Sequence, residues 1–374
     1  MSNKPIRLGF IGLSTHGWAS MALVPPLLQA PLSSKYSLVA VSTSNADSAA
    51  ASAQKYTELK AAGSSGGDAP VKAYHGPASQ IASDPDVDMI AVAINSTFQK
   101  EAALSAIEAG KDVFIEWPVG RSLQETQELA DAAKRKGVRS LIGAQTRLSG
   151  YVDTIKEIID SGKLGKIVST SFIGSYPREL LMWGPQVSTS HAYALSASNG
   201  VTLLEVGGGH LIDMFAYVFG PIQLSSISTG LFKNQYPTAE LVDPSTRQPT
   251  GEVRKQETPH QLAFSGSFAS GSVFNAHVRG ALPASSTSFT WIIDGENGSL
   301  KVEENAPFVM SSKPDVHLNG EKVEIKEETP FQKIARAWED FADGTGKATT
   351  LEDALNTKEV LEEIKKSAVA QGLC

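Results

Sequence analysis

The first part of the chain alternates short apolar runs with helix-forming stretches, and this alternation is the feature that most narrows the fold. The apolar runs are IRLGFIGL, YSLVAVSTS, VDMIAVAI, DVFIEW and RSLIGAQ. Such runs, rich in β-branched residues, are typical of strands buried on both faces of a parallel sheet. The stretches between them, such as ADSAAASAQKYTELKAA, are rich in good helix formers. This spacing predicts a Rossmann-type α/β domain with a mostly parallel sheet over residues 1–148.

The rest of the chain has a different pattern. Stretches such as HQLAFSGSFASGSVFNAHV and SFTWIIDGENGSLKVEE alternate apolar and polar residues, and DGENGS offers the residues of a tight turn. Helical stretches precede and follow them. A chain of 374 residues also exceeds what one hydrophobic core usually serves. We therefore expect a second domain over residues 149–374, of the α+β class, with a large, mostly antiparallel open sheet.

Composition and charge exclude several classes of function. The formal net charge of −7 leaves no basic surface for direct contact with nucleic acid. The only cysteine is Cys374, which excludes a disulfide framework and a thiolate metal cluster, so no metal site is expected. No run reaches the roughly 18 apolar residues of a membrane span. We expect a cytoplasmic protein, or a nuclear one if the chain is a regulator.

A glycine-rich corner, GLSTHG, follows the first expected strand. Gly12, Ser14 and Gly17 have the spacing of the G-x-G-x-x-G motif, with Ser14 at the second glycine and with Thr15 and His16 between. The motif needs a tight turn at its first glycine, a close backbone approach at its second and close helix packing at its third. Amides at the start of the next helix would then receive a pyrophosphate. The alternative is a purely structural turn.

The helix expected after this corner, WASMALVPPLLQA, contains two consecutive prolines. Pro25 and Pro26 lack amide hydrogens, so they must kink the helix or restart it.

The end of the second expected strand bears on the choice between NAD and NADP. A carboxylate there would hold the adenosine ribose 2′-hydroxyl of NAD. The sequence instead offers Ser42, Thr43 and Ser44, with no acid to repel a 2′-phosphate. NADP is therefore favoured over NAD, and a simple polar cap on the next helix is the alternative.

The motifs IRLGFIGLSTHG, VDMIAVAI, AIEAGKDVFIEWP, GAQTR, SGKLGKI and GGGHLID occur in the order found in one family. In these motifs, over nearly its whole length, the chain resembles the glucose–fructose oxidoreductase and inositol dehydrogenase family. GFIGL, GWA and EWP resemble its fungal branch, which includes the yeast galactose-pathway repressor. The resemblance implies either a dinucleotide-dependent oxidoreductase or a dinucleotide-binding regulator that is not an enzyme.

The resemblance also assigns Glu116, Trp117 and Pro118 to the cofactor-binding corner of the family's active site, with Trp117 facing the substrate as well, and identifies a departure there. The family usually has Glu-Lys-Pro here, and the lysine hydrogen-bonds the reacting hydroxyl or carbonyl. An indole N–H can donate a hydrogen bond but cannot exchange a proton near neutral pH. General acid–base catalysis is typically worth about 10²- to 10⁴-fold, so another group must move the proton if the chain is an enzyme.

Other positions are assigned through the same resemblance. Asn95, Gln99 and Arg147 match positions near the cofactor, and Arg147 also lies near the substrate in the family; the alternative for Arg147 is a surface ion pair. Gln99 stands where the family often has a histidine. His210 matches a substrate-facing histidine whose usual partner is an aspartate four residues earlier. Here the nearest acid, Glu205, is five residues earlier.

The spacing of Glu205 and His210 decides whether their side chains can meet when the segment between them is helical. On an α-helix, side chains four residues apart differ in direction around the axis by about 40°, and side chains five residues apart differ by about 140°. The two side chains can therefore meet only if VGGG is not a regular helix, which its three glycines permit.

Candidates for proton transfer are His210, Tyr176 and Tyr193, with simple packing as the alternative for each. Trp183 and Trp117 would form an apolar wall for a ring-shaped ligand, or part of the core. The expected substrate is a small sugar-like or cyclic metabolite with a carbonyl or carbinol. An imine or activated alkene would instead need no proton carrier from the protein.

We expect the open sheet to be covered by a second subunit in a homodimer or tetramer. Under the regulator hypothesis the partner is a transcription activator, although the charge of −7 disfavours an acidic peptide.

Overall fold

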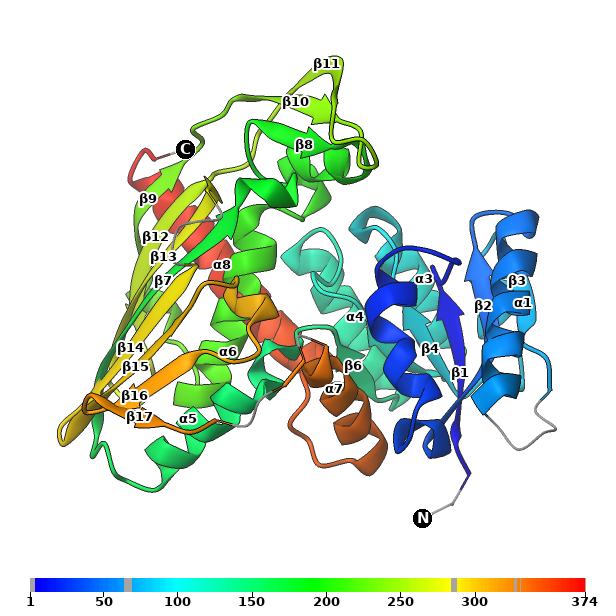
Figure 1. The fold of residues 1–374 in the computed structure, drawn as a ribbon, viewed down its shortest axis with the longest axis horizontal. Helices are drawn as coiled ribbons and strands as arrows, with labels where there is room; N and C mark the ends of the chain where they lie inside the picture. Colours follow the sequence, from blue (N-terminus) through cyan, green and yellow to red (C-terminus); the bar gives the residue numbers. More distant parts are fainter. Residues whose placement is uncertain (1–3, 64–68, 284–287, 326–327, 330, 374) are drawn as a thin grey trace. The chain divides into compact units, whose positions relative to one another are not determined.

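The structure is a computed structural model that describes residues 4–63, 69–283, 288–325, 328–329 and 331–373 (Figure 1). The chain forms two compact units. The first combines residues 1–148 with 331–355, and the second combines residues 149–330 with 356–374. The sequence placed everything after residue 148 in the second domain, so the return of residues 331–355 to the first unit is a difference from that expectation.

In the described part of the first unit, six parallel strands form one sheet with the order β3-β2-β1-β4-β5-β6 (Figure 1). They are β1 (Ile6–Ile11), β2 (Tyr36–Thr43), β3 (Lys72–His75), β4 (Met89–Val92), β5 (Asp112–Ile115) and β6 (Ser140–Ile142). This is the doubly wound dinucleotide-binding order, in which the chain reverses its direction of strand addition between β1 and β4. The predicted Rossmann-type sheet is confirmed, and β3 is an additional strand that the sequence analysis did not identify.

The main helices of this unit follow the strands. They are α1 (Ala46–Gly63), α2 (Ser79–Ala82), α3 (Ser96–Glu108) and α4 (Leu123–Lys136). The stretch after β1 is not an α-helix: a π-helical turn, η1 (Ala19–Leu23), is followed by a 3₁₀ turn, η2 (Pro25–Leu28). The predicted interruption at Pro25 and Pro26 is confirmed, because neither proline can donate a backbone hydrogen bond.

Helix α7 (Gln332–Asp343) belongs to the first unit because its apolar face is part of that unit's core. The buried residues of this face are Ile334, Ala337, Trp338 and Phe341. Trp338 stacks on Phe114 of β5 with 4.7 Å between ring centroids, and the Tyr36 hydroxyl donates to the Trp338 carbonyl at 2.7 Å.

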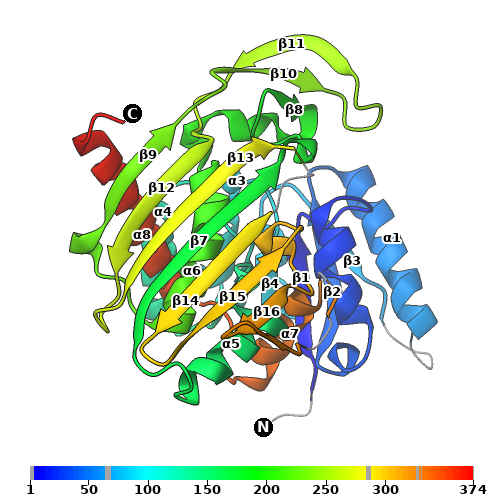
Figure 2. The ribbon, with the colours of Figure 1, turned by 60° about the vertical axis from the view of Figure 1, so that its left-hand side comes forward.

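Within the described residues of the second unit, eight strands form a sheet with the order β17-β16-β15-β14-β7-β13-β12-β9 (Figure 2). They are β7 (Ile167–Pro177), β9 (Ser228–Lys233), β12 (Gln261–Ser267), β13 (Val273–Leu282), β14 (Phe289–Gly295), β15 (Gly298–Glu304), β16 (Asp315–Leu318) and β17 (Glu321–Val323). Only β7 and β13 pair in parallel. The predicted mostly antiparallel sheet is confirmed, including the β14–β15 hairpin, which pairs Gly295 with Gly298.

One face of this sheet packs on helices α5 (Gly150–Asp160), α6 (Gly209–Phe219) and α8 (Leu351–Ala370). Phe215 of α6 stacks on Trp291 of β14 at 5.8 Å, and the Thr229 hydroxyl of β9 donates to the Ile364 carbonyl of α8 at 2.8 Å. The opposite face exposes apolar side chains of β7 and β13, with Ile173 45% and Val273 50% exposed.

A smaller sheet of β8 (Gln186–Ser188), β10 (Thr238–Val242) and β11 (Pro249–Lys255) was not predicted. Every residue of β11 is exposed, so this strand has no apolar pattern. By length and hydropathy the stretch Ala197–Phe219 could cross a membrane, but 83% of its most apolar window is buried inside the structure.

Candidate functional site

The glycine corner lies at the carboxyl end of β1. Gly12 has φ +90°, and a Cβ atom there would lie 2.4 Å from the carbonyl oxygen of Ala93, which follows β4. Only glycine fits this turn. Gly17 also needs glycine for its φ of +95°, but no described atom lies within 4 Å of its Cβ position. The close helix packing expected at Gly17 is therefore wrong, because the turn leaves this position open.

The polar groups of the corner fold back on the loop. The Ser14 hydroxyl donates to the His16 carbonyl at 2.5 Å, and Thr15 Oγ1 lies 2.8 Å from His16 Nδ1. Lys55 of α1 donates through Nζ to the Thr15 carbonyl at 2.8 Å. The sequence analysis missed Lys55, which brings a positive charge beneath the loop. A tight turn with an open third glycine and an ammonium group fits an anionic pyrophosphate.

The three hydroxyl residues at the end of β2 differ in their exposure to solvent. Ser42 is buried, whereas Thr43 is half-buried and Ser44 is exposed. Asn45 then accepts a hydrogen bond from the Ser48 amide at 2.9 Å at the start of α1. The helix cap is therefore Asn45, which leaves the Ser44 side chain at the surface.

The corner after β5 is held from within by α3. Gln99 is buried, its side-chain amide donates to the Glu116 carbonyl at 3.0 Å, and its Oε1 accepts from the Gly120 amide at 2.9 Å. Asn95 caps α3 by accepting from the Thr97 amide at 3.1 Å. Both side chains thus support the backbone of this edge. Trp117 is buried and precedes Pro118 through a cis peptide bond.

Glu116 is half-buried, and its carboxyl group has no charged partner in hydrogen-bond distance among the described residues. The indole Nε1 of Trp18 donates to its Oε1 at 3.1 Å, while Oε2 has no hydrogen-bond partner in the described structure. Burial raises the pKa of Glu116 from 4.5 to about 8, and the Trp18 hydrogen bond opposes this only in part. A Cβ at Gly143 would lie 2.6 Å from Oε2, so only glycine leaves room for the carboxyl group.

Arg147 is buried, but its ion-pair partner Asp353 is 37% exposed, so the pair lies at the edge of the surface. Arg147 lies in a 3₁₀ turn, η4 (Gln145–Leu148), its side chain is 7% exposed, and its guanidinium is 3.5 Å from the Asp353 carboxylate. In the described chain, no group of three or more histidine, cysteine or acidic side chains is arranged to hold a metal ion.

In the second unit, Glu205 and His210 are joined by a π-helical turn, η8 (Leu204–Gly208), that leads into α6. The condition derived from their spacing is met, since VGGG is not a regular α-helix. The Glu205 carboxylate, however, accepts from Lys365 of α8 at 2.5 Å and from the Thr202 hydroxyl. Burial raises its pKa, but Lys365 and Lys358 outweigh this and hold the pKa below its ordinary value. Glu205 is thus an ionised group with a lysine partner.

Tyr176 packs against this π-helical turn. A Cβ at Gly207 would lie 2.8 Å from the Tyr176 ring, and the ring of Trp183 meets it edge-on at 5.3 Å. The Tyr176 hydroxyl is buried and has no hydrogen-bond partner among the described residues. Burial raises the pKa of Tyr176, and likewise that of the less buried Tyr193. The indole N–H of Trp183 donates a hydrogen bond to the Val201 carbonyl at 3.2 Å. Only the ring face of Trp183 can therefore contact a ligand.

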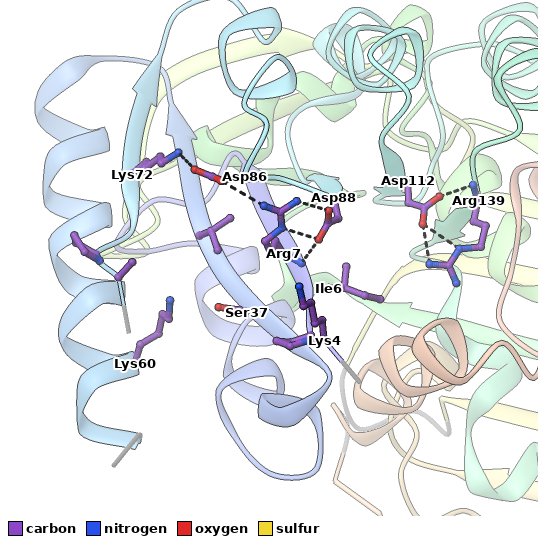
Figure 3. Close-up of a pocket in the computed structure, with 14 residues that line it drawn as sticks. Lys4, Ile6, Arg7, Ser37, Lys60, Lys72, Asp86, Asp88, Asp112 and Arg139 are labelled. Carbon is purple, nitrogen blue, oxygen red and sulfur yellow. Dashed lines mark hydrogen bonds and ion pairs between the residues drawn. The ribbon is translucent and has the colours of Figure 1, made fainter. Parts of the chain in front are cut away.

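A broad depression of about 850 Å³ lies at the opposite, amino-terminal edge of the parallel sheet (Figure 3). Most of its charged side chains form ion pairs with one another, while Lys60 donates to the Leu38 carbonyl at 2.8 Å. The pairs are Arg7–Asp88 at 2.8 Å, Lys72–Asp86 at 2.7 Å and Arg139–Asp112 at 2.7 Å. Ligands of doubly wound sheets bind at the carboxyl ends of the strands, so we do not assign the dinucleotide to this depression.

Comparison with known proteins is consistent with this geometry. The family model described as an oxidoreductase family with an NAD-binding Rossmann fold matches residues 6–144, and the model of the Gal80p C-terminal domain matches residues 150–304. The two halves of the chain thus match the Gfo/Idh/MocA oxidoreductase family and its Gal80-like branch. The chain resembles both a dehydrogenase and fungal regulators.

Two Gfo/Idh/MocA relatives illustrate this. Dehydrogenase aclE of Aspergillus oryzae is 29% identical over 377 residues, covering 98% of this chain and 97% of that protein. The galactose/lactose metabolism regulatory protein GAL80 of Saccharomyces cerevisiae is also 29% identical, over 84% of this chain and 71% of its own length. The structure of a super-repressor mutant of that Gal80p aligns with a TM-score of 0.84 at 25% identity, covering 98% of this chain and 97% of that one. Levoglucosan dehydrogenase in complex with NADH and levoglucosan aligns with a TM-score of 0.73 at 18% identity over 98% of each chain, which shows the shared fold.

Proposed function

We propose that this protein is an NAD(P)-dependent oxidoreductase that transfers a hydride to or from a carbonyl or carbinol of a small sugar-like or cyclic metabolite. The observation that carries the proposal is the corner after β1, where Gly12 approaches the Ala93 carbonyl so closely that only glycine fits. Such a turn brings backbone amides to a pyrophosphate. The bound dinucleotide would supply or accept the hydride, and the protein must bind the substrate and move a proton.

We assign the proton transfer to His210, because histidine is the side chain that exchanges protons most readily near neutral pH. Tyr176 and Tyr193 remain protonated, since burial raises the pKa of each. They are therefore hydrogen-bond donors to the substrate rather than bases. The unpartnered, buried Tyr176 hydroxyl supports this role.

The remaining site residues would shape the substrate pocket. Trp117 and the ring of Trp183 offer apolar faces to a ring-shaped substrate, and Arg147 is positioned by Asp353. Glu205 would keep Lys365 and the π-helical turn in place, a supporting role that its ion pair favours. An imine or activated alkene substrate would relieve the need for a strong proton donor, which fits tryptophan in place of the family's lysine.

We infer NADP as the preferred cofactor. The end of β2 carries no acid, and Thr43 and Ser44 offer hydroxyls near the surface to a 2′-phosphate. We further propose a cytoplasmic homodimer or tetramer in which a second subunit covers the apolar side chains on the open sheet face, including Ile173 and Val273. Light scattering that gives a monomer at micromolar concentration would contradict the oligomer.

The test is a screen of sugars, polyols, cyclic ketones and imines, followed through the absorbance of the reduced nicotinamide. The wild-type protein should turn over at least one class. His210→Ala should lose at least about 10²-fold in kcat while it retains dinucleotide affinity. His317→Ala, on strand β16, is the matched control and should retain activity.

The second candidate is a dinucleotide-binding regulator that does not turn over substrate. Two observations favour it: Trp117 occupies the family's lysine position, and the Gal80p C-terminal domain model matches residues 150–304. In this case the dinucleotide binds, the screen yields no turnover, and a transcription-activator segment binds in a manner that NADP changes. A nuclear location would fit this candidate.

A further inference from the structure

The carboxyl group of Glu116 has no part in the function proposed above, yet its surroundings are unusual. Glu116 is half-buried at the carboxyl edge of the sheet, but its Oε2 is shielded from solvent and has no hydrogen-bond partner among the described residues. Gly143 closes one side, since any larger residue there would overlap Oε2. A buried carboxylate needs a cation or several donors, whereas a neutral carboxylic acid needs neither. This environment therefore favours the protonated form.

Among the described residues, the hydrogen-bond donor to the Glu116 carboxyl group comes from the glycine corner. Trp18 directly follows Gly17, and its indole donates to Glu116 Oε1 at 3.1 Å. The same ring meets Phe331 edge-on at 6.1 Å at the start of α7. One hydrogen bond thus joins the loop assigned to the pyrophosphate with the corner assigned to the nicotinamide end.

We propose that Glu116 is held as a neutral carboxylic acid and that, through Trp18, it couples dinucleotide binding to the uptake of a proton. The inference rests on the proposed function, because it needs a dinucleotide at the glycine corner. The dinucleotide adds negative charge next to the loop, which disfavours a second negative charge on Glu116. The dinucleotide should therefore bind more tightly to the protein in which Glu116 is protonated than to the protein in which Glu116 is ionised.

The charged groups on the neighbouring segments do not offset this. His16 lies on the loop, Lys100 and Glu101 on α3, Arg147 after β6, and Lys333 and Arg336 on α7. Burial raises the pKa of Glu116, and the Trp18 hydrogen bond lowers it only in part. The titration is therefore set by Glu116 and the loop it contacts.

The linkage has a definite sign. With a pKa of about 8 in the free protein, Glu116 is already protonated at pH 7, and binding takes up little proton there. Above about pH 8 the free protein must first take up a proton, so the affinity should fall by about tenfold per pH unit until the pKa of the complex is reached.

The experiment is calorimetric titration with NADH and NADPH from about pH 7 to 10, in buffers of different ionisation enthalpy so that proton uptake is measured directly. The wild-type protein should take up close to one proton at about pH 9, with an affinity about tenfold below that at pH 7. Glu116→Gln keeps a carbonyl oxygen for Trp18 but cannot titrate, so its affinity should stay level and its proton uptake should vanish. Glu101→Gln, at an exposed position of α3, is the control and should behave as the wild type.

Trp18→Phe gives a second test that does not depend on the folding of the Glu116 variant. It keeps an aromatic ring against Phe331 and removes the donor that lowers the pKa of Glu116, so the midpoint of the pH dependence should rise. A wild-type protein without proton uptake, or an unchanged midpoint in Trp18→Phe, would overturn the coupling. If neither nucleotide binds at any pH, the proposed function fails instead, so the two failures are distinguishable.

Discussion

Replacing Glu116 by glutamine should stabilise the protein, and increasingly so as the pH rises. In the unfolded chain this carboxyl group loses its proton near 4.5, whereas in the folded protein burial raises its pKa to about 8. Between these values the folded state binds the additional proton, so the free energy of unfolding must fall as the pH rises through the window. The glutamine variant has no titratable group at this position, so its free energy of unfolding does not fall for this reason as the pH rises.

The magnitude follows from the two pKa values. Each pH unit inside the window costs about 1.4 kcal/mol, and the loss between pH 5 and pH 8 is about 3 kcal/mol. Titrations elsewhere in the chain affect both proteins alike, so the difference between them isolates Glu116. The variant should be close to the wild type at about pH 5 and more stable by about 3 kcal/mol at about pH 8.

The assay is urea unfolding followed by circular dichroism at several pH values, with Glu101→Gln on α3 as an exposed control. The control should follow the wild type throughout. If the free energies of unfolding of the wild type and Glu116→Gln change in parallel with pH, Glu116 is ionised in the folded protein and the reasoning is refuted.

Three further predictions concern other residues. Gly12→Ala forces a side chain into φ +90° and against the Ala93 carbonyl, so it should destabilise the protein by about 2 kcal/mol or more and remove dinucleotide binding, as measured by thermal unfolding and calorimetry. Ser44→Asp should shift the ratio of NADPH to NADH affinity by about tenfold toward NADH, measured by fluorescence titration, because the carboxylate repels a 2′-phosphate and accepts from a ribose hydroxyl. Lys365→Met should cost about 1 to 2 kcal/mol at neutral pH, since it leaves the Glu205 carboxylate with less compensation while Lys365 itself is 38% exposed. This cost should shrink as the pH falls and Glu205 becomes protonated, and a cost independent of pH would contradict the assignment.

The sequence predicted the elements whose signal is local. The apolar runs of β1, β2, β4, β5 and β6 are buried in a parallel sheet, and such strands have a characteristic composition. Strand β3 (Lys72–His75) was missed because it is short and mostly exposed, and β11 because it is exposed throughout. The turn at Gly12 was predictable since its backbone requirement acts within a few residues.

Much of the candidate site had no local signal. The hydrogen bond between Trp18 and Glu116 joins residues 98 positions apart, and Lys55 reaches the Thr15 carbonyl from 40 positions away. The ion pair of Glu205 with Lys365 depends on the packing of α8 in the second unit. Sequence spacing could state the condition for Glu205 to approach His210, but it could not reveal that a lysine already pairs with Glu205.

The most direct test of the account is a calorimetric titration of the wild-type protein with NADPH and NADH at neutral pH. We expect saturable heat with about one nucleotide bound per chain, and tighter binding of NADPH than of NADH. The absence of binding heat with both nucleotides, in oxidised and reduced form, would contradict it.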